Sequence, residues 1–299
     1  MLEDYKSRSA VLAAPDFPRE ALRVRPLDAD SVRVLRYMQG VESYTPFYLR
    51  SLLATRAAHE PGIAAFLAGW LYEETGHGLA IAALLEANGT PLAPRSGRRE
   101  SWRERLTAAG TAWVSHARRD FPAVHMLWGA INELTAVAAY RRLGRRSGHP
   151  VVADLCARIA RDEARHFSFY FDEARRRLAA PRTQRLARRL VARFWAPVGS
   201  GVEPESEVRF LQQHLFGGEE GRAAARKVDA TIQALPGMAG LPLLEARLER
   251  DAAERARGAP RLRAPSWGEM PGAGAARRNQ RRARVGPARA PEEPREACT

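Results

Sequence analysis

Apolar residues recur every three to four positions along most of the chain as far as about residue 258, the spacing of one buried helix face. Long alternations of Val, Ile and Tyr with polar residues, the pattern of a β-strand, are absent. The pattern therefore predicts an all-α fold. From Gly258 onward the apolar periodicity stops and Ala, Pro, Gly and Arg dominate. We therefore expect 1–258 to be the folded domain and 259–299 to be a disordered basic tail.

Capping and helix-breaking residues divide the periodic region into four long helices. Their expected limits are Asp28–Ser31 to about His59, Pro61 to Asn88-Gly89, Asp120-Phe121-Pro122 to about Gly148, and His149-Pro150 to about Pro181. We also expect a helix at 101–118 within the connection between the second and third long helices. Additional C-terminal helices are expected at 182–195, 206–216, 219–234 and 240–257. Pro46 cannot donate a hydrogen bond to the carbonyl of Glu42, so a kink is expected in the first helix.

Charge and cysteine usage add little to this outline. The net charge is +14, and all basic residues except Lys6 and Lys227 are Arg, which with abundant Ala fits a GC-rich coding bias. The two cysteines, Cys156 and Cys298, lie far apart, which argues against a disulfide framework. No apolar run is long enough to span a membrane, and residues 1–14 lack the apolar core of a signal peptide. We therefore expect a cytoplasmic protein.

Two copies of Glu-x-x-His carry the chemistry: Glu74-Thr75-Gly76-His77 and Glu163-Ala164-Arg165-His166. This spacing puts a carboxylate and an imidazole on one helix face, one turn apart. Two such helices, with one Glu from each of two other helices, are what a bundle needs to hold a pair of metal ions. Glu42 and Glu133 are the candidates for these two further carboxylates.

The positions of the glutamates relative to the predicted turns support this grouping. Residues of two antiparallel helices lie level when they are equidistant from the connecting turn. Glu133 and Glu163 have their midpoint at 148, inside a predicted turn, and Glu42 and Glu74 have theirs at 58, beside another. The longer separation of Glu74 from Glu133 suits a crossover that makes the second and third long helices parallel.

Less specific interpretations remain open at this point. One Glu-x-x-His is a weak signal, and both copies could be surface pairs on amphipathic helices. Glu60 is the other upstream acid, but it lies at the turn and cannot be level with Glu74. Glu73 lacks the spacing to a His and is expected to lie outside the ligand set. Apolar stripes around Glu74, Glu133 and Glu163 favour an interior location, where a carboxylate needs a partner or a metal.

The segments Glu73-Glu74-Thr75-Gly76-His77-Gly78 and Asp162-Glu163-Ala164-Arg165-His166 resemble the paired motifs of the soluble acyl-ACP desaturases, Glu-Glu-x-x-His-Gly and Asp-Glu-x-x-His. The resemblance covers about 30–180 and implies a ferritin-like four-helix bundle, with the extra helices at 182–258. It implies a di-iron enzyme that uses O₂ and two electrons to insert a double bond into a fatty acyl chain. The iron ligands carried over are Glu42, Glu74, His77, Glu133, Glu163 and His166, and Asp162 would orient a ligand His.

The same resemblance implies the partners. The acyl chain would be carried as a thioester on acyl carrier protein or on another carrier, and a ferredoxin-type protein would supply the electrons. A homodimer is expected. Two Fe ions are the expected cofactor, with Mn as the alternative metal.

The chain departs from the family at one position near the oxygen site. The family often has a Thr one turn after the third-helix Glu, where this chain has Ala136, with Thr135 one position away. Hydroxylation or another oxidation therefore stays open, as do a non-catalytic iron-binding protein and a helical scaffold without metal. Ile81 stands where the radical-generating ribonucleotide reductase subunit has a Tyr, and Ile159 where the di-iron arylamine N-oxygenases have an extra His.

The remaining candidates carry weaker signals. The basic clusters could dock an acidic carrier protein, although ordinary solvated helix faces explain any one of them equally well. They are Arg98-Arg99, Arg103, Arg105, Arg141-Arg142, Arg145-Arg146 and Arg175–Arg177. The basic tail has Trp267 as its only aromatic residue, so no nucleic-acid partner is expected. The other histidines have no acid at ligand spacing and are expected to be structural or exposed: His59, His116, His125, His149 and His214.

Overall fold

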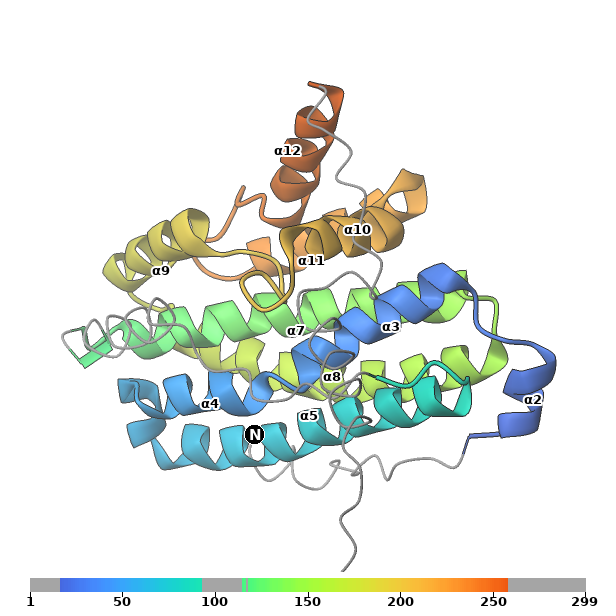
Figure 1. Cartoon of the computed structure of the whole chain (residues 1–299). Helices are drawn as coiled ribbons and strands as arrows, with labels where there is room; N and C mark the ends of the chain where they lie inside the picture. Colours follow the sequence, from blue (N-terminus) through green and yellow to red (C-terminus); the bar gives the residue numbers. More distant parts are fainter. Residues whose placement is uncertain (1–16, 93–114, 117, 258–299) are drawn as a thin grey trace, which may run out of the picture. The chain divides into compact units, whose positions relative to one another are not determined.

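The computed structural model describes residues 17–92, 115–116 and 118–257. Within these residues the chain is helical, with one isolated bridge between Ser200 and Glu203 and no strand, which confirms the predicted all-α class (Figure 1). The helices are α2 (Arg19–Val24), α3 (Ala29–Glu42), α4 (Thr45–Leu53), η1 (Arg56–His59), α5 (Pro61–Ala87), α7 (Phe121–Arg146), α8 (Pro150–Arg177), α9 (Pro181–Phe194), α10 (Glu205–Phe216), α11 (Gly218–Gln233) and α12 (Leu244–Ala256). The predicted tail and most of the predicted helix at 101–118 lie outside the described residues.

The helix ends lie at the capping residues that the sequence indicates. The Asp28 carboxylate accepts a hydrogen bond from the Ser31 amide at 2.8 Å and begins α3. His149 caps α8 through its Nδ1, which accepts from the Val151 amide at 3.3 Å. A proline in the first turn begins α5, α7, α8 and α9, where its missing N–H has no helical partner to lose. None of the described helices is long and apolar enough to cross a membrane.

The first long helix differs from its prediction. Instead of one kinked helix reaching His59, the chain ends α3 at Glu42 and begins α4 at Thr45, followed by the short η1. Pro46 stands in the first turn of α4, so the position that would donate to the Glu42 carbonyl has no N–H. The break places Glu42 at the very end of a helix, where its backbone is no longer tied to a following turn.

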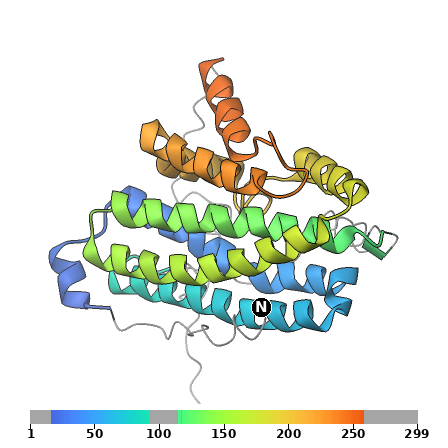
Figure 2. The same ribbon diagram turned by 180° about the vertical axis from the view of Figure 1, so that it is seen from behind.

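The four long helical segments lie side by side (Figures 1 and 2). The α3 helix packs against α5, α7 packs against α8, and α5 also contacts α8. Both α5 and α7 run from the left to the right of Figure 1, so they are parallel, as the long connection between them predicts. Assignment of this arrangement to the ferritin-like group stays a prediction.

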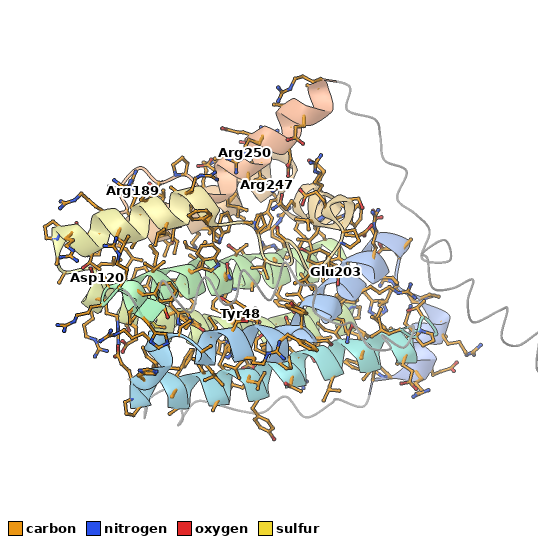
Figure 3. The ribbon with its side chains drawn as sticks, turned by 60° about the vertical axis from the view of Figure 1, so that its left-hand side comes forward. Tyr48, Asp120, Arg189, Glu203, Arg247 and Arg250 are labelled. Carbon is orange, nitrogen blue, oxygen red and sulfur yellow. The ribbon has the colours of Figure 1, made fainter. Side chains whose placement is uncertain are left out.

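The four C-terminal helices, α9 to α12, form a second layer on α7. Helices α9, α10 and α11 pack against α7, and α12 packs on α10 and α11. Asp229 of α11 lies at the start of α12, where its carboxylate accepts hydrogen bonds from the amides of Leu243, Leu244 and Glu245 at 3.0–3.2 Å. At the other end of the layer, the Thr183 hydroxyl of α9 donates to Asp120, just before α7, at 3.1 Å (Figure 3).

Two apolar clusters fill the bundle on either side of one polar layer. One cluster includes Ile81, Leu143 and Ile159, and the other includes Phe66, Met126 and Phe169. The Glu and His residues of the two motifs lie along α5 and α8 between these clusters. Charged groups in such a position require partners or a bound cation.

Candidate metal centre

Four helices each place a carboxylate in the polar layer. Glu42 is the last residue of α3, Glu74 lies in the middle of α5, Glu133 in α7 and Glu163 in α8. The two histidines follow one turn after the glutamates of α5 and α8. All six side chains are buried, and the exposed fraction of none exceeds 7%.

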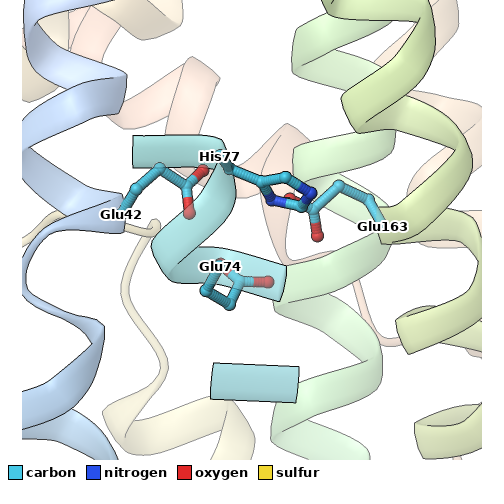
Figure 4. A group of neighbouring side chains, drawn as sticks. All are labelled: Glu42, Glu74, His77 and Glu163. Atoms are coloured by element: carbon cyan, nitrogen blue, oxygen red, sulfur yellow. The ribbon is translucent and has the colours of Figure 1, made fainter. Parts of the chain in front are cut away.

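The six residues form two overlapping groups. Ligand atoms of the first group lie within 4.8 Å of one another, and so do those of the second. The first group is Glu42, Glu74, His77 and Glu163 (Figure 4), and the second is Glu74, Glu133, Glu163 and His166. Each group offers three carboxylates and one imidazole, and Glu74 and Glu163 belong to both. The structure therefore brings together every ligand that the sequence predicts, in an arrangement that could hold metal ions.

The His77 ring has its two nitrogens facing different partners. Its Nδ1 lies 3.3 Å from Oε1 of Glu163, inside the ligand group, while Nε2 lies 3.1 Å from Oδ2 of Asp162, outside it. A carboxylate at Nε2 fixes the tautomer with the proton on that nitrogen, because Nε2–H can then donate. The lone pair of Nδ1 is left for a metal. Asp162 thus contacts one of the two candidate ligand imidazoles.

His166 repeats this arrangement from the opposite helix. Its Nδ1 lies 3.1 Å from Oε1 of Glu74, and its Nε2 lies 2.6 Å from Oε2 of Glu73. Glu73 is therefore outside the ligand set, as predicted, but its partner is the His of the other motif. No local sequence pattern indicates this pairing, because the two residues are 93 positions apart.

Arg165 joins the two outer acids. Its guanidinium donates to Glu73 at 2.9 Å and to Asp162 at 2.6 Å. Both contacts use different nitrogens of one planar group, so the guanidinium fixes the two carboxylates relative to each other. The outer acids in turn fix the two imidazoles. The position of Arg165 inside the second motif, next to Asp162, is the sequence signal for its role.

Two atoms of the ligand set lack an aligned hydrogen bond to any described residue. They are Nδ1 of His77 and Oε1 of Glu74, both fully buried. Each nevertheless lies within 3.3 Å of another ligand atom. Buried polar atoms that converge without hydrogen bonds are the expected state of a ligand set, because a bound cation is their partner. The donor set therefore fits a metal pair.

The pKa values of the buried carboxyl groups in this layer also favour a bound cation. Burial, followed by the charges of neighbouring carboxylates, raises the pKa of Glu42 and Glu74, and raises the pKa of Glu133 to about 8. Burial also opposes ionisation of Glu163, but the adjacent imidazoles of His166 and His77 hold its pKa below the ordinary value. Four carboxylates this close can all be charged only with positive charge beside them. Two divalent ions would balance their four negative charges.

Tyr140 is a member of the site that the sequence reasoning missed. Its hydroxyl donates a hydrogen bond to Oε1 of Glu42, and burial, followed by the Glu42 charge, raises the pKa of the phenol. Tyr140 lies two turns after Glu133 on the same face of α7, which is the signal that could have found it. The hydrogen bond gives Glu42, at the end of α3, a fixed contact with the far side of the bundle.

Gly78 explains the glycine of the first motif. A Cβ at this position would lie 3.2 Å from Cβ of Glu42, so the absence of a side chain lets α3 approach α5 at the ligand layer. Thr135 lies one position away from the place where the desaturase family often has a Thr. Its hydroxyl donates to the Ile131 carbonyl of its own helix at 2.7 Å and does not serve the ligand layer.

Several basic side chains named as docking candidates are paired within the chain. Arg175 contacts Asp172, Arg176 and Arg177 contact Glu173, and Arg142 contacts Glu220. The residues 98–105 lie outside the described part of the chain, and docking stays a prediction. Comparison of the chain with models of known protein families, with curated proteins and with solved structures finds no match.

Proposed function

We propose that this protein is an O₂-dependent di-iron oxidoreductase that introduces a double bond into a fatty acyl chain, carried as a thioester on acyl carrier protein. The observation that carries the proposal is the pair of overlapping buried ligand groups that share Glu74 and Glu163. Carboxylate-rich sites with one imidazole per metal suit iron, and manganese is the alternative. Iron bound there would supply the redox chemistry that O₂ activation requires.

The residues of the chain hold and shield such a pair. Asp162 and Glu73 hold the proton on Nε2 of the two imidazoles, so that Nδ1 of each ring faces the carboxylates of the ligand groups. The apolar clusters on either side exclude water from the layer, which strengthens the electrostatic interactions within it. The hydroxyl of Tyr140 donates a hydrogen bond that holds the Glu42 carboxylate in place. Without this bond the carboxylate would be free to move, because α3 ends at Glu42.

The acyl substrate and the protein partners are proposed from the two Glu-x-x-His motifs. Their likeness to the soluble acyl-ACP desaturases supports the acyl thioester substrate, and a ferredoxin-type donor would supply the electrons. A homodimer is supported by the outward face of α5, where Tyr72 and Leu79 are 61% and 60% exposed. Hydroxylation or another oxidation is the second candidate, favoured by Ala136 and by the engaged hydroxyl of Thr135.

Metal content tests the proposal. Wild-type protein from iron-supplied cells should contain two irons per chain, and Glu163→Ala should lose both, because Glu163 belongs to both ligand groups. Glu86→Ala is the matched control, since Glu86 is on α5 but exposed.

Iron-loaded protein should then remove two hydrogens from an acyl chain on acyl carrier protein, with ferredoxin, its reductase and O₂. A folded wild type that binds no iron, even after anaerobic Fe(II) addition, overturns the metal centre. An iron-loaded protein that stores iron without oxidising any acyl substrate favours the non-catalytic alternative.

A further inference from the structure

An aromatic group lies beside the ligand layer, toward the start of α7. Its rings come from four helices and centre on Tyr170, one turn after His166. Phe66 and Trp70 of α5 lie 5.0 and 6.5 Å from the Tyr170 ring, centroid to centroid, and His125 of α7 lies at 6.1 Å. Tyr48 of α4 packs edge-on against Trp70 at 6.3 Å (Figure 3). These rings form one connected cluster.

Two members of this cluster have polar atoms without partners. Both ring nitrogens of His125 and the indole Nε1 of Trp70 are buried and make no hydrogen bond with any described residue. Each side chain is only 5% exposed. A buried polar atom without a partner costs about 1–3 kcal/mol, so three of them in one cluster indicate a missing partner. The sequence predicts His125 to be structural or exposed, but it is neither exposed nor hydrogen-bonded.

The cluster is continuous with the ligand layer. His125, Gly129 and Glu133 follow each other at intervals of four on one face of α7, so His125 lies about 12 Å from Glu133 along the helix. The space over Gly129 is taken by the Tyr170 ring, whose Cδ1 would lie 2.3 Å from a Cβ at that position. A ligand bound at His125 would thus be separated from the carboxylates by one aromatic ring.

The unpartnered atoms define the chemistry of the missing group. Burial, followed by the charge of Arg177, lowers the pKa of His125 to about 4, so the ring is neutral at pH 7 and offers one donor and one acceptor. The Trp70 indole offers a donor only. Methylene groups satisfy none of these atoms. An amide or a hydroxyl satisfies them, because each both donates and accepts.

We propose that His125 and Trp70 bind an uncharged amide or hydroxyl group of the molecule that is oxidised at the adjacent ligand layer. The aromatic rings around Tyr170 would contact the apolar part next to that group. The proposal rests on the proposed function in taking this molecule to be the substrate. It adds that the substrate carries a hydrogen-bonding group inside the bundle, next to its apolar chain.

Binding of small probes to the full-length protein tests this site. Benzamide and benzyl alcohol carry the two candidate groups on an aromatic ring, and ethylbenzene is the apolar control. The ¹⁵N signals of the His125 ring, assigned with His125→Phe, report binding. We expect saturable shifts with benzamide or benzyl alcohol, a loss of affinity of at least tenfold in both His125→Phe and Trp70→Phe, and no loss in His59→Phe. Whichever probe binds more tightly identifies the group as amide or hydroxyl.

The opposite results are equally clear. Unshifted His125 signals with both probes mean that ordered water completes the cluster, and they overturn the proposal. Binding that survives both His125→Phe and Trp70→Phe, or ethylbenzene binding as tightly as benzamide, overturns it as well. Should His125→Phe fail to fold, Trp70→Phe alone decides. Iron content is measured on the same samples and should equal that of the wild type, so failure of the metal centre is recognised separately.

Discussion

The Nε2 atom of His77 on α5 lies 3.1 Å from the Asp162 carboxylate on α8, and this contact has a counterpart in the opposite direction. Nε2 of His166 on α8 lies 2.6 Å from the Glu73 carboxylate on α5. In each motif, the acid that precedes the Glu of Glu-x-x-His therefore contacts Nε2 of the imidazole in the other motif. Helices α5 and α8 thus each position the candidate ligand His of the other helix, and the Arg165 guanidinium donates hydrogen bonds to both Glu73 and Asp162.

Removal of one outer acid should weaken metal binding without removing a ligand. Asp162→Ala leaves the His77 ring free to turn and to change tautomer, so we expect the affinity for Fe(II) to fall by roughly 10- to 100-fold. Anaerobic titration with Fe(II) measures it. Asp172→Ala, on the same helix but exposed and paired with Arg175, should leave the affinity unchanged. Equal affinities for Asp162→Ala and the wild type would show that the contact has no role in binding.

Close packing at Gly129 predicts a local steric effect. In Gly129→Ala the new Cβ would lie 2.3 Å from Cδ1 of Tyr170, so the ring must move or the helices must separate. We expect a loss of about 1–3 kcal/mol in the free energy of unfolding, measured by urea denaturation. Gly62→Ala, in the first turn of α5, meets nothing within 4 Å and should be neutral or stabilising. A Gly129→Ala protein as stable as the wild type would mean that the Tyr170 ring shifts at no cost.

The helices and the ligand set could be predicted because they depend on local spacing. A 3.6-residue period and the capping residues fix where each helix begins and ends, and equidistance from a turn fixes which residues are level. Glu133 and Glu163 meet for that reason alone. The same reasoning worked for Glu42 and Glu74 although the helix between Glu42 and the turn is broken.

Contacts that depend on how side chains reach across the bundle could not be predicted. The hydrogen bond from Tyr140 to Glu42 joins residues 98 positions apart, and no local pattern specifies it. The same holds for the contact of His166 with Glu73. Pro46 predicts a kink, whereas the structure ends α3 at Glu42 and begins a new helix at Thr45. A proline removes one hydrogen bond, but packing decides whether the helix continues.

Metal binding should release protons near neutral pH. Burial, followed by the Glu163 charge, raises the pKa of Glu133 to about 8, so this carboxyl is largely protonated at pH 7 in the metal-free protein. A bound cation requires the carboxylate form, and the proton leaves. Calorimetric titration with Fe(II) or Mn(II) should therefore give an apparent enthalpy that depends on the ionisation enthalpy of the buffer. That dependence should vanish in Glu163→Ala, where binding is lost. Buffer-independent enthalpies at pH 7 would contradict a protonated ligand set.

The neutral His125 ring should make the protein sensitive to acid. The pKa of His125 falls from 6.5 to about 4 on folding, so between these pH values the unfolded chain binds a proton that the folded chain does not. Stability is therefore lost as the pH falls from 6.5 to 4, by at most about 3 kcal/mol from this residue. His125→Phe removes this loss, so the difference in unfolding free energy between variant and wild type should grow in favour of the variant toward pH 4. A difference that is the same at pH 7 and pH 4 would show that His125 titrates normally.

The outward face of α5 predicts self-association. Between residues 63 and 85 its exposed residues are Ala65, Ala68, Tyr72, Thr75 and Leu79, which follow the helical period and include no charged side chain; the exposed Glu86 lies beyond them. An exposed apolar stripe is often covered by a partner, and a two-fold axis would cover this stripe with its own copy. Sedimentation velocity should show a dimer for the wild type and a monomer for Leu79→Arg combined with Tyr72→Arg. Val24→Arg, at an apolar residue on α2 that is 74% exposed, should stay dimeric. A wild type that sediments as a monomer at every concentration would exclude the stripe as a dimer interface.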